Sequence, residues 1–168
     1  ERYYPASITK ILTALIVIER CNLDDTITFS YDAVHNVENG STSAGYGVGD
    51  RITVREALYA LLLRSANEVA NALAEHCAGS REAFAALMNE KAASLGCKES
   101  HFTNPSGLND ENHYTTAYDY SLIAMAAFKN PTFVEFDSTT YYELPPNSAN
   151  AEPFTIYAGH KMLKKSSG

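Results

Sequence analysis

The stretch that begins at Ser7 constrains this chain more than any other. Pro5 precedes it and suits the edge of a helix start, because the N–H that proline lacks is not needed there. The spacing of the apolar residues that follow predicts a helix over residues 6–21 with one buried face. On such a helix Ser7 and Lys10, three residues apart, lie on the same face close to the N-terminus. The apolar residues of the buried face are Ile8, Ile11, Leu12, Leu15 and Ile16.

A serine beside a lysine at a helix start can act as a nucleophile. The lysine amine can accept the hydroxyl proton, and the oriented N–H groups of the helix N-terminus favour a developing oxyanion. The alternative is that Ser7 only caps the helix, since serine is a favoured N-cap residue. Ser-x-x-Lys occurs by chance in many sequences, so the choice between the two depends on the rest of the chain.

The composition is that of an ordinary globular domain and argues against some functions. The 168 residues are 45% hydrophobic and 20% charged, enough for one domain with a core. A net charge of −7 is unfavourable for binding nucleic acid. No apolar run reaches membrane-spanning length, and the five histidines lack the paired spacing of a zinc site. Cys21 and Cys77 end apolar helical patterns, which predicts buried thiols.

Capping signals predict three further helices. Thr53 and Glu56 have the spacing of a capping box, and apolar residues continue at helical spacing to Leu73. Ser80 and Gly96 fit the start and the end of the next helix, and Thr116 opens another with Asp119 in its first turn. Residues 26–31, 133–144 and 153–158 read as strands, the last two around a Pro-Pro turn, and residues 36–50 and 101–115 read as loops.

Ser65-Ala-Asn67 is a second group of interest. Ser65 falls on the apolar stripe of its predicted helix, where a hydroxyl needs a partner or a role. Ser65 and Asn67 are two residues apart, so an unbroken helix would put them on different faces. If both serve one site, the helix has to break near Ser65. The alternative is a serine that bonds back to its own helix, with Asn67 exposed.

Together, Ser-x-x-Lys and Ser-x-Asn are two of the three motifs of serine penicillin-recognising enzymes. Three blocks resemble, in order and spacing, the D-alanyl-D-alanine carboxypeptidases of the low-molecular-weight penicillin-binding type. These blocks are Tyr4–Thr13, Leu63–Glu68 and His101–Leu108, and the resemblance extends from about Tyr3 to Leu163.

The resemblance implies a mainly α fold with a few β strands. This is the helical part of a β-lactamase/transpeptidase-like α+β domain whose central sheet is largely missing from the chain. The third motif, Lys-Thr-Gly or Lys-Ser-Gly, is absent, because Lys164–Gly168 has one serine too many. We therefore expect residues 1–168 to be a single catalytic domain truncated at both ends, with reduced activity and an uncovered apolar face through which it self-associates.

The resemblance also implies the chemistry. Ser7 would attack the bond between the last two D-alanines of a peptidoglycan stem peptide, and β-lactams would acylate the same atom. Lys10 would accept the Ser7 proton, Ser65 would relay a proton to the leaving amine, and Asn67 would bind the substrate. No metal or organic cofactor is needed. Family members act outside the cytoplasmic membrane, often held there by an anchor.

Other functions stay open at this point. A class A-like β-lactamase shares both motifs but needs a glutamate for deacylation, and the surroundings of Glu111 do not match that motif. A non-catalytic β-lactam-sensing or wall-binding domain is compatible with the missing third motif. A DD-endopeptidase would use the same chemistry on cross-links.

Overall fold

Helices make up about half of the computed structural model, which describes residues 2–3, 8–38, 41–108 and 110–158. The short strands form two-stranded antiparallel sheets: β1 with β4, β2 with β3, and β5 with β6. This confirms the expected mainly α fold with a few strands. The helices are α1 (Ile8–Arg20), α2 (Tyr31–His35), α3 (Val54–Arg64), α4 (Asn67–Ala78), α5 (Arg81–Ser94), α6 (Ala117–Phe128) and α7 (Pro131–Asp137). The strands are β1 (Arg2–Tyr3), β2 (Thr26–Thr28), β3 (Arg51–Thr53), β4 (Thr115–Thr116), β5 (Tyr141–Leu144) and β6 (Phe154–Tyr157).

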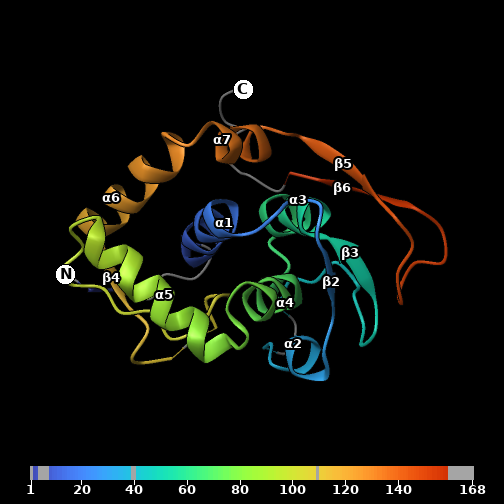
Figure 1. The fold of residues 1–168 in the computed structure, drawn as a ribbon, viewed down its shortest axis with the longest axis horizontal. Coiled ribbons are helices and arrows are strands. Elements are labelled where there is room, and N and C mark those ends of the chain that lie inside the picture. Colours follow the sequence, from blue (N-terminus) through green and yellow to red (C-terminus); the bar gives the residue numbers. More distant parts are fainter. Residues whose placement is uncertain (1, 4–7, 39–40, 109, 159–168) are drawn as a thin grey trace.

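Helix α1 lies in the middle of the molecule, and α3, α4, α5, α6 and α7 all pack against it (Figure 1). Residues 12–17 are buried without interruption, so this helix is covered on more than the one face that its sequence pattern predicts. Burial of its leucine and isoleucine side chains contributes about 1.5–3 kcal/mol each. The predicted helix over residues 6–21 is confirmed within the described residues.

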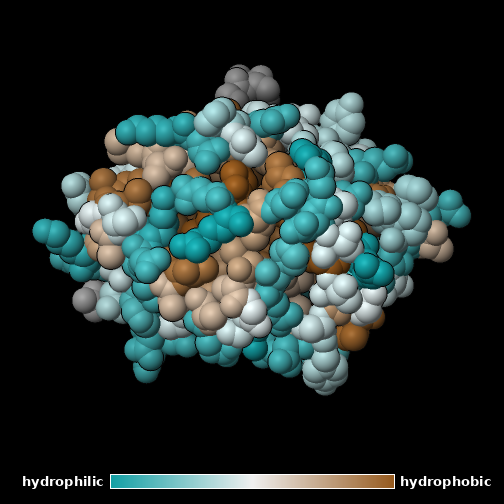
Figure 2. All heavy atoms as spheres, viewed as in Figure 1, coloured by the Kyte–Doolittle hydropathy of each residue, from teal (hydrophilic) through white to brown (hydrophobic). Residues whose placement is uncertain are grey.

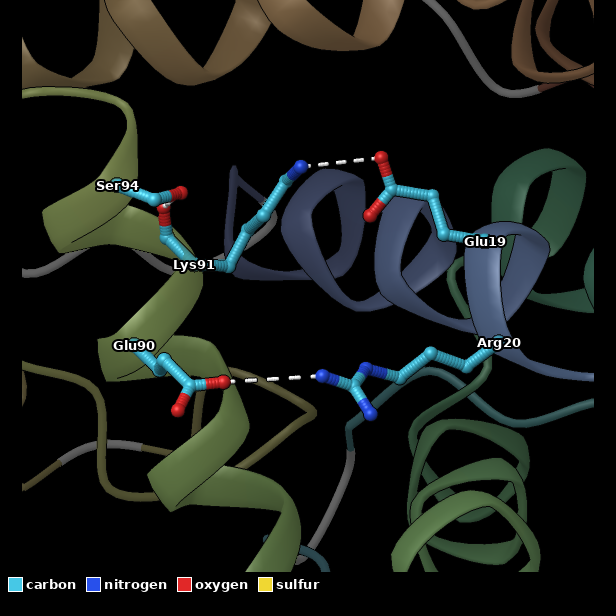
Figure 3. Close-up of polar contacts among 5 residues, drawn as sticks. All are labelled: Glu19, Arg20, Glu90, Lys91 and Ser94. Atoms are coloured by element: carbon cyan, nitrogen blue, oxygen red, sulfur yellow. Dashed lines mark hydrogen bonds and ion pairs between the residues drawn. The ribbon is translucent and has the colours of Figure 1, made fainter.

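Two ion pairs link the end of α1 to α5. Lys91 Nζ lies 3.0 Å from Glu19 Oε2, and Arg20 lies 3.7 Å from Glu90 Oε1 (Figure 3). Solvent-exposed pairs of this kind contribute little to stability. The packing of apolar side chains therefore fixes the position of α1, and the ion pairs at its end add little to stability.

The predicted helix starts are confirmed by the side chains that cap them. Thr53 and Glu56 form the reciprocal bonds of a capping box at the start of α3. Ser80 Oγ accepts the N–H of Ala83 at 3.0 Å, and Thr116 Oγ1 accepts the N–H of Asp119 at 3.1 Å. Each bond satisfies an amide that the helix leaves without an internal partner.

Two of the predicted strands are partly wrong. The strand over 26–31 ends at Thr28, because Ser30 caps the short helix α2 by accepting the N–H of Ala33. The strand over 133–144 begins only at Tyr141. Asn130 and Pro131 start helix α7 instead, with Asn130 Oδ1 accepting two backbone N–H groups of its first turn. The β5–β6 hairpin around the Pro-Pro turn is confirmed.

The surface mixes apolar and polar side chains. Figure 2 shows apolar residues exposed near the middle of one face, around α1, with hydrophilic side chains between and around them. In the described part of the chain, none of the helices has the length and apolar character needed to cross a membrane. The prediction of buried thiols is wrong for Cys21 and Cys77, which are only half-buried because both lie at helix ends, whereas Cys97 is buried.

Candidate active site

Lys10 is the centre of the polar groups that the structure gathers at the start of α1. Its side chain is buried, and Nζ donates a hydrogen bond to the backbone carbonyl oxygen of Ser106 at 2.8 Å. Burial lowers the pKa of Lys10 to about 8, because the charged amine loses hydration, while the carboxylate of Glu68 acts in the opposite direction. The lysine is therefore suited to exchange a proton near neutral pH. Ser7 lies outside the described residues.

Two neighbours of Lys10 on α1 hold the loop 101–115 against the helix. Thr9 Oγ1 lies 2.8 Å from His113 Nε2, and Thr13 Oγ1 donates to the carbonyl oxygen of Pro105 at 2.8 Å. All of these groups are buried. The three polar side chains of α1 at positions 9, 10 and 13 thus bind one loop. These bonds fix the position of the Ser106 carbonyl, which accepts the hydrogen bond from Lys10.

His113 has one defined tautomer in this arrangement. The backbone N–H of Thr103 donates to Nδ1 at 2.9 Å, so Nδ1 is the acceptor and the proton of the neutral ring is on Nε2. Nε2–H then donates to Thr9 Oγ1. Burial lowers the pKa of His113 to about 4, which keeps the ring neutral at physiological pH.

Asn104 shapes the loop that carries the Ser106 carbonyl. Its Oδ1 accepts the backbone N–H groups of Gly107 at 2.7 Å and Leu108 at 2.8 Å, and its Nδ2 donates to the carbonyl oxygen of Leu108. Gly107 has a φ of +88°, a conformation that glycine adopts without strain. The Asn-Pro-Ser-Gly sequence therefore forms a fixed turn beside Lys10.

The helix breaks at Ser65, as it must if Ser65 and Asn67 are to serve one site. Helix α3 ends at Arg64, and Ser65 has φ 57° and ψ 38°, in the left-handed region that non-glycine residues rarely adopt. Helix α4 begins two residues later, at Asn67. The apolar pattern that ran on to Leu73 belongs to two helices and not to one. The alternative predicts an exposed Asn67, but Asn67 is partly buried.

Glu68 holds a second loop against this break. Its side chain is only 3% exposed, and Oε2 accepts from Ser43 Oγ at 2.9 Å, Ala44 N at 2.9 Å and Tyr46 N at 3.3 Å. Asn67 N also donates to the carbonyl oxygen of Thr42. Within the described part of the chain, Glu68 Oε1 and Asn67 Oδ1 are buried acceptors without a hydrogen-bond partner. These two oxygen atoms at the start of α4 can therefore each accept a further hydrogen bond.

Sequence reasoning missed Glu68, Thr9, Thr13 and His113. A signal existed for Glu68 and Thr9, because each adjoins a residue singled out by its motif. Nothing in the local pattern marked His113, whose partner lies 104 positions away in the chain. A groove of about 460 Å³ adjoins Arg64 and the β5–β6 hairpin, but Lys10, Ser65 and Asn67 do not line it.

Comparison with known proteins identifies the family. The sequence profile of the family described as "D-alanyl-D-alanine carboxypeptidase" matches residues 1–160. The chain belongs to this family.

Relatives support the assignment over nearly the whole chain. It is 37% identical over 168 residues to D-alanyl-D-alanine carboxypeptidase DacF of Bacillus subtilis, covering 98% of this chain and 42% of that protein. It is 37% identical over 154 residues to DacB2 of Mycobacterium tuberculosis, covering 90% of this chain and 51% of the relative. The chain thus spans about half of these curated relatives or less.

Solved structures agree. A D-alanyl-D-alanine carboxypeptidase from M. tuberculosis superposes with a TM-score of 0.89 and 30% identity, covering 100% of this chain and 62% of that one. The DD-transpeptidase of Streptomyces K15 gives 0.88 and 31%, covering 99% of this chain and 68% of that one. The fold is accordingly that of part of a penicillin-binding DD-peptidase domain.

Proposed function

We propose that residues 1–168 carry the nucleophile and the base of a serine-type D-Ala-D-Ala carboxypeptidase. The observation that carries this proposal is Lys10, a buried lysine with a lowered pKa at the start of the central helix. An amine in this state can take a proton from a serine one helical turn away. Membership of the D-alanyl-D-alanine carboxypeptidase family supplies the reaction class.

The proposed reaction starts with attack of Ser7 Oγ on the carbonyl between the last two D-alanines of a peptidoglycan stem peptide. Lys10 takes the hydroxyl proton, and Ser65 passes a proton to the leaving amine of D-alanine. Water then hydrolyses the ester on Ser7. The chemistry uses no metal or organic cofactor.

The proposed role of Asn67 is to bind the substrate backbone and to help hold Lys10. The buried Oδ1 of Asn67 has no hydrogen-bond partner among the described residues. A backbone N–H of the substrate or the amine of Lys10 would satisfy this acceptor. The N–H of Ser7 would form one half of the oxyanion hole. Peptidoglycan as substrate and acylation by β-lactams both follow from this reaction. Membership of the family supports the further proposal that the complete protein acts outside the cytoplasmic membrane and is associated with it.

A fluorescent penicillin tests the nucleophile. The chain should be labelled, the Ser7→Ala variant should not, and the adduct should map to Ser7. Ser94→Ala is the matched control, because Ser94 is an exposed serine on α5 whose hydroxyl bonds its own helix (Figure 3). Label retained in Ser7→Ala would overturn the proposal, and rapid release of hydrolysed penicillin would favour a β-lactamase instead.

We further propose that these 168 residues react slowly by themselves, since they contain no Lys-Thr-Gly or Lys-Ser-Gly sequence. Loss of a single oxyanion donor reduces rates by roughly 10²–10³-fold. Turnover of a D-Ala-D-Ala peptide at the rate of a complete carboxypeptidase would contradict this. The expected self-association through apolar surface is tested by light scattering over a range of concentrations, where a constant monomer mass would exclude it.

A further inference from the structure

Cys21 and Cys77 form a thiol pair that the proposed reaction does not use. Cys21 directly follows α1, and its N–H still bonds the helix at Val17 O. Cys77 lies in the last turn of α4, which packs against α1. The two thiols are hydrogen-bonded to each other, and both are free and half-buried. His76, next to Cys77, lies 3.4 Å from Asp25 (Nε2 to Oδ2), so the ends of α1 and α4 lie side by side. Two cysteines 56 positions apart in the sequence thus come within reach of each other.

The hydrogen bond between the two thiols, more than the charges around them, makes the thiols unequal. The hydrogen bond from the Cys21 thiol lowers the pKa of Cys77 against the opposing effect of burial, and the guanidinium of Arg20 lowers it further. The pKa of Cys21 is raised, chiefly because its thiol proton is held in that bond, then by burial, with a smaller contribution from Asp25. Cys77 is therefore the better nucleophile.

We propose that Cys21 and Cys77 are a disulfide-forming pair that joins the end of α1 to the end of α4. The oxidant is a disulfide, either oxidised glutathione or the active-site disulfide of a thiol oxidase. The Cys77 thiolate attacks one sulfur of the oxidant and expels the other as a thiolate. Cys21 then gives up its proton to solvent, attacks Cys77 Sγ and expels the second thiolate. The chain loses two protons and two electrons, and the oxidant gains the electrons.

This bond would act on the two helices that carry the candidate site. Lys10 lies at the start of α1 and Asn67 at the start of α4. The disulfide would join the other ends of these two helices, away from the candidate site residues. It would also close a loop that contains the break at Ser65. The inference rests on the thiol contact alone and holds whether or not the chain is a peptidase.

Cys97 is the matched control within the same chain. It is buried, its thiol donates to the backbone carbonyl oxygen of Asp119 at 3.5 Å, and burial raises its pKa to about 11. A buried thiol with a raised pKa reacts slowly with disulfides. Oxidation of the folded chain should therefore select Cys21 and Cys77.

The test is oxidation of the folded chain with oxidised glutathione, followed by acid quench, denaturation, maleimide labelling and peptide mapping. The unsubstituted chain and Cys97→Ser should each lose two reactive thiols and give a Cys21–Cys77 cross-linked peptide. Cys21→Ser should stop at a glutathione adduct on Cys77. Three reactive thiols remaining in the unsubstituted chain, a bond to Cys97, or an unresolved Cys77 adduct would each overturn the proposal.

Thermal unfolding gives an independent measurement. A disulfide that closes a loop of this size should raise the Tm by on the order of 10 °C. Dithiothreitol should remove that gain in the oxidised chain and leave the Tm of Cys21→Ser unchanged. Equal Tm values for the cross-linked and reduced chains would contradict a bond that fits the native fold.

Discussion

Acidification should destabilise this protein through His113. Burial lowers the pKa of this ring from 6.5 to about 4 in the folded chain. Between these pH values the unfolded chain binds a proton that the folded chain does not, so the free energy of unfolding falls as the pH decreases from 6.5 to 4. Each tenfold change in proton affinity is worth about 1.4 kcal/mol, which gives a loss of about 3 kcal/mol over this range.

The cause of this loss is visible in the contacts of the ring. A protonated His113 would carry N–H groups on both nitrogens, but Nδ1 already receives the N–H of Thr103. Protonation therefore turns an acceptor into a donor that faces another donor. The Nε2–H bond to Thr9, which adjoins Lys10, is kept on protonation. The new clash with the N–H of Thr103 displaces the ring, so the loop beside the candidate base should loosen first.

Urea unfolding at pH values from about 7 to about 4 measures the effect. The substitution His113→Gln removes the titrating group while its amide keeps one donor and one acceptor for the same partners. Carboxylates titrate in both proteins, so the difference between the two curves isolates His113. The unsubstituted chain should lose about 3 kcal/mol more than the variant. His35→Gln, which removes an exposed histidine on α2, is the matched control. Identical pH dependence in the unsubstituted chain and His113→Gln would refute the reasoning.

Three further predictions concern the candidate site. Ser65→Gly should be more stable than Ser65→Ala by about 1 kcal/mol in urea unfolding, because only glycine adopts φ 57° without strain; equal stabilities would argue against strain at this turn. The rate of Ser7 acylation by a penicillin should rise with pH through about 8, where Lys10 becomes neutral; a rate independent of pH would count against Lys10 as the base. Glu68→Ala should cost about 2–5 kcal/mol in urea unfolding, because two buried backbone N–H groups lose their acceptor. Ser43→Ala, which removes an exposed donor to the same carboxylate, should cost far less.

Local chemistry explains which elements the sequence could predict. Thr53, Ser80 and Thr116 cap helices with side chains that reach only three residues ahead, so their patterns contain the whole interaction. Helix α7 was missed for a related reason. Phe133 and Phe136 favour strands by residue type, but Asn130 caps a helix that Pro131 begins. The capping signal of Asn130 and Pro131 outweighs the aromatic composition in this segment.

Long-range contacts explain what the sequence could not supply. His113 and Thr9 meet across 104 positions, and Glu68 binds backbone groups 22 to 24 positions earlier. No periodicity in the sequence predicts such pairs, because the two partners come within reach of each other only in the folded chain. Lys10 could be named from its motif, but its lowered pKa is a property of the packing around α1.

The turn at Ser65 joins the local and the long-range arguments. A left-handed conformation costs a non-glycine residue roughly 1–2 kcal/mol, so glycine would end α3 more cheaply than serine does. Neighbouring bonds hold the turn from both sides: Arg64 Nε donates to Ser43 O, and Asn67 N donates to Thr42 O. Backbone stability alone therefore does not account for a serine at this position. Its hydroxyl is the one feature that glycine would lack, which is why stability and penicillin acylation should change in opposite directions in Ser65→Gly.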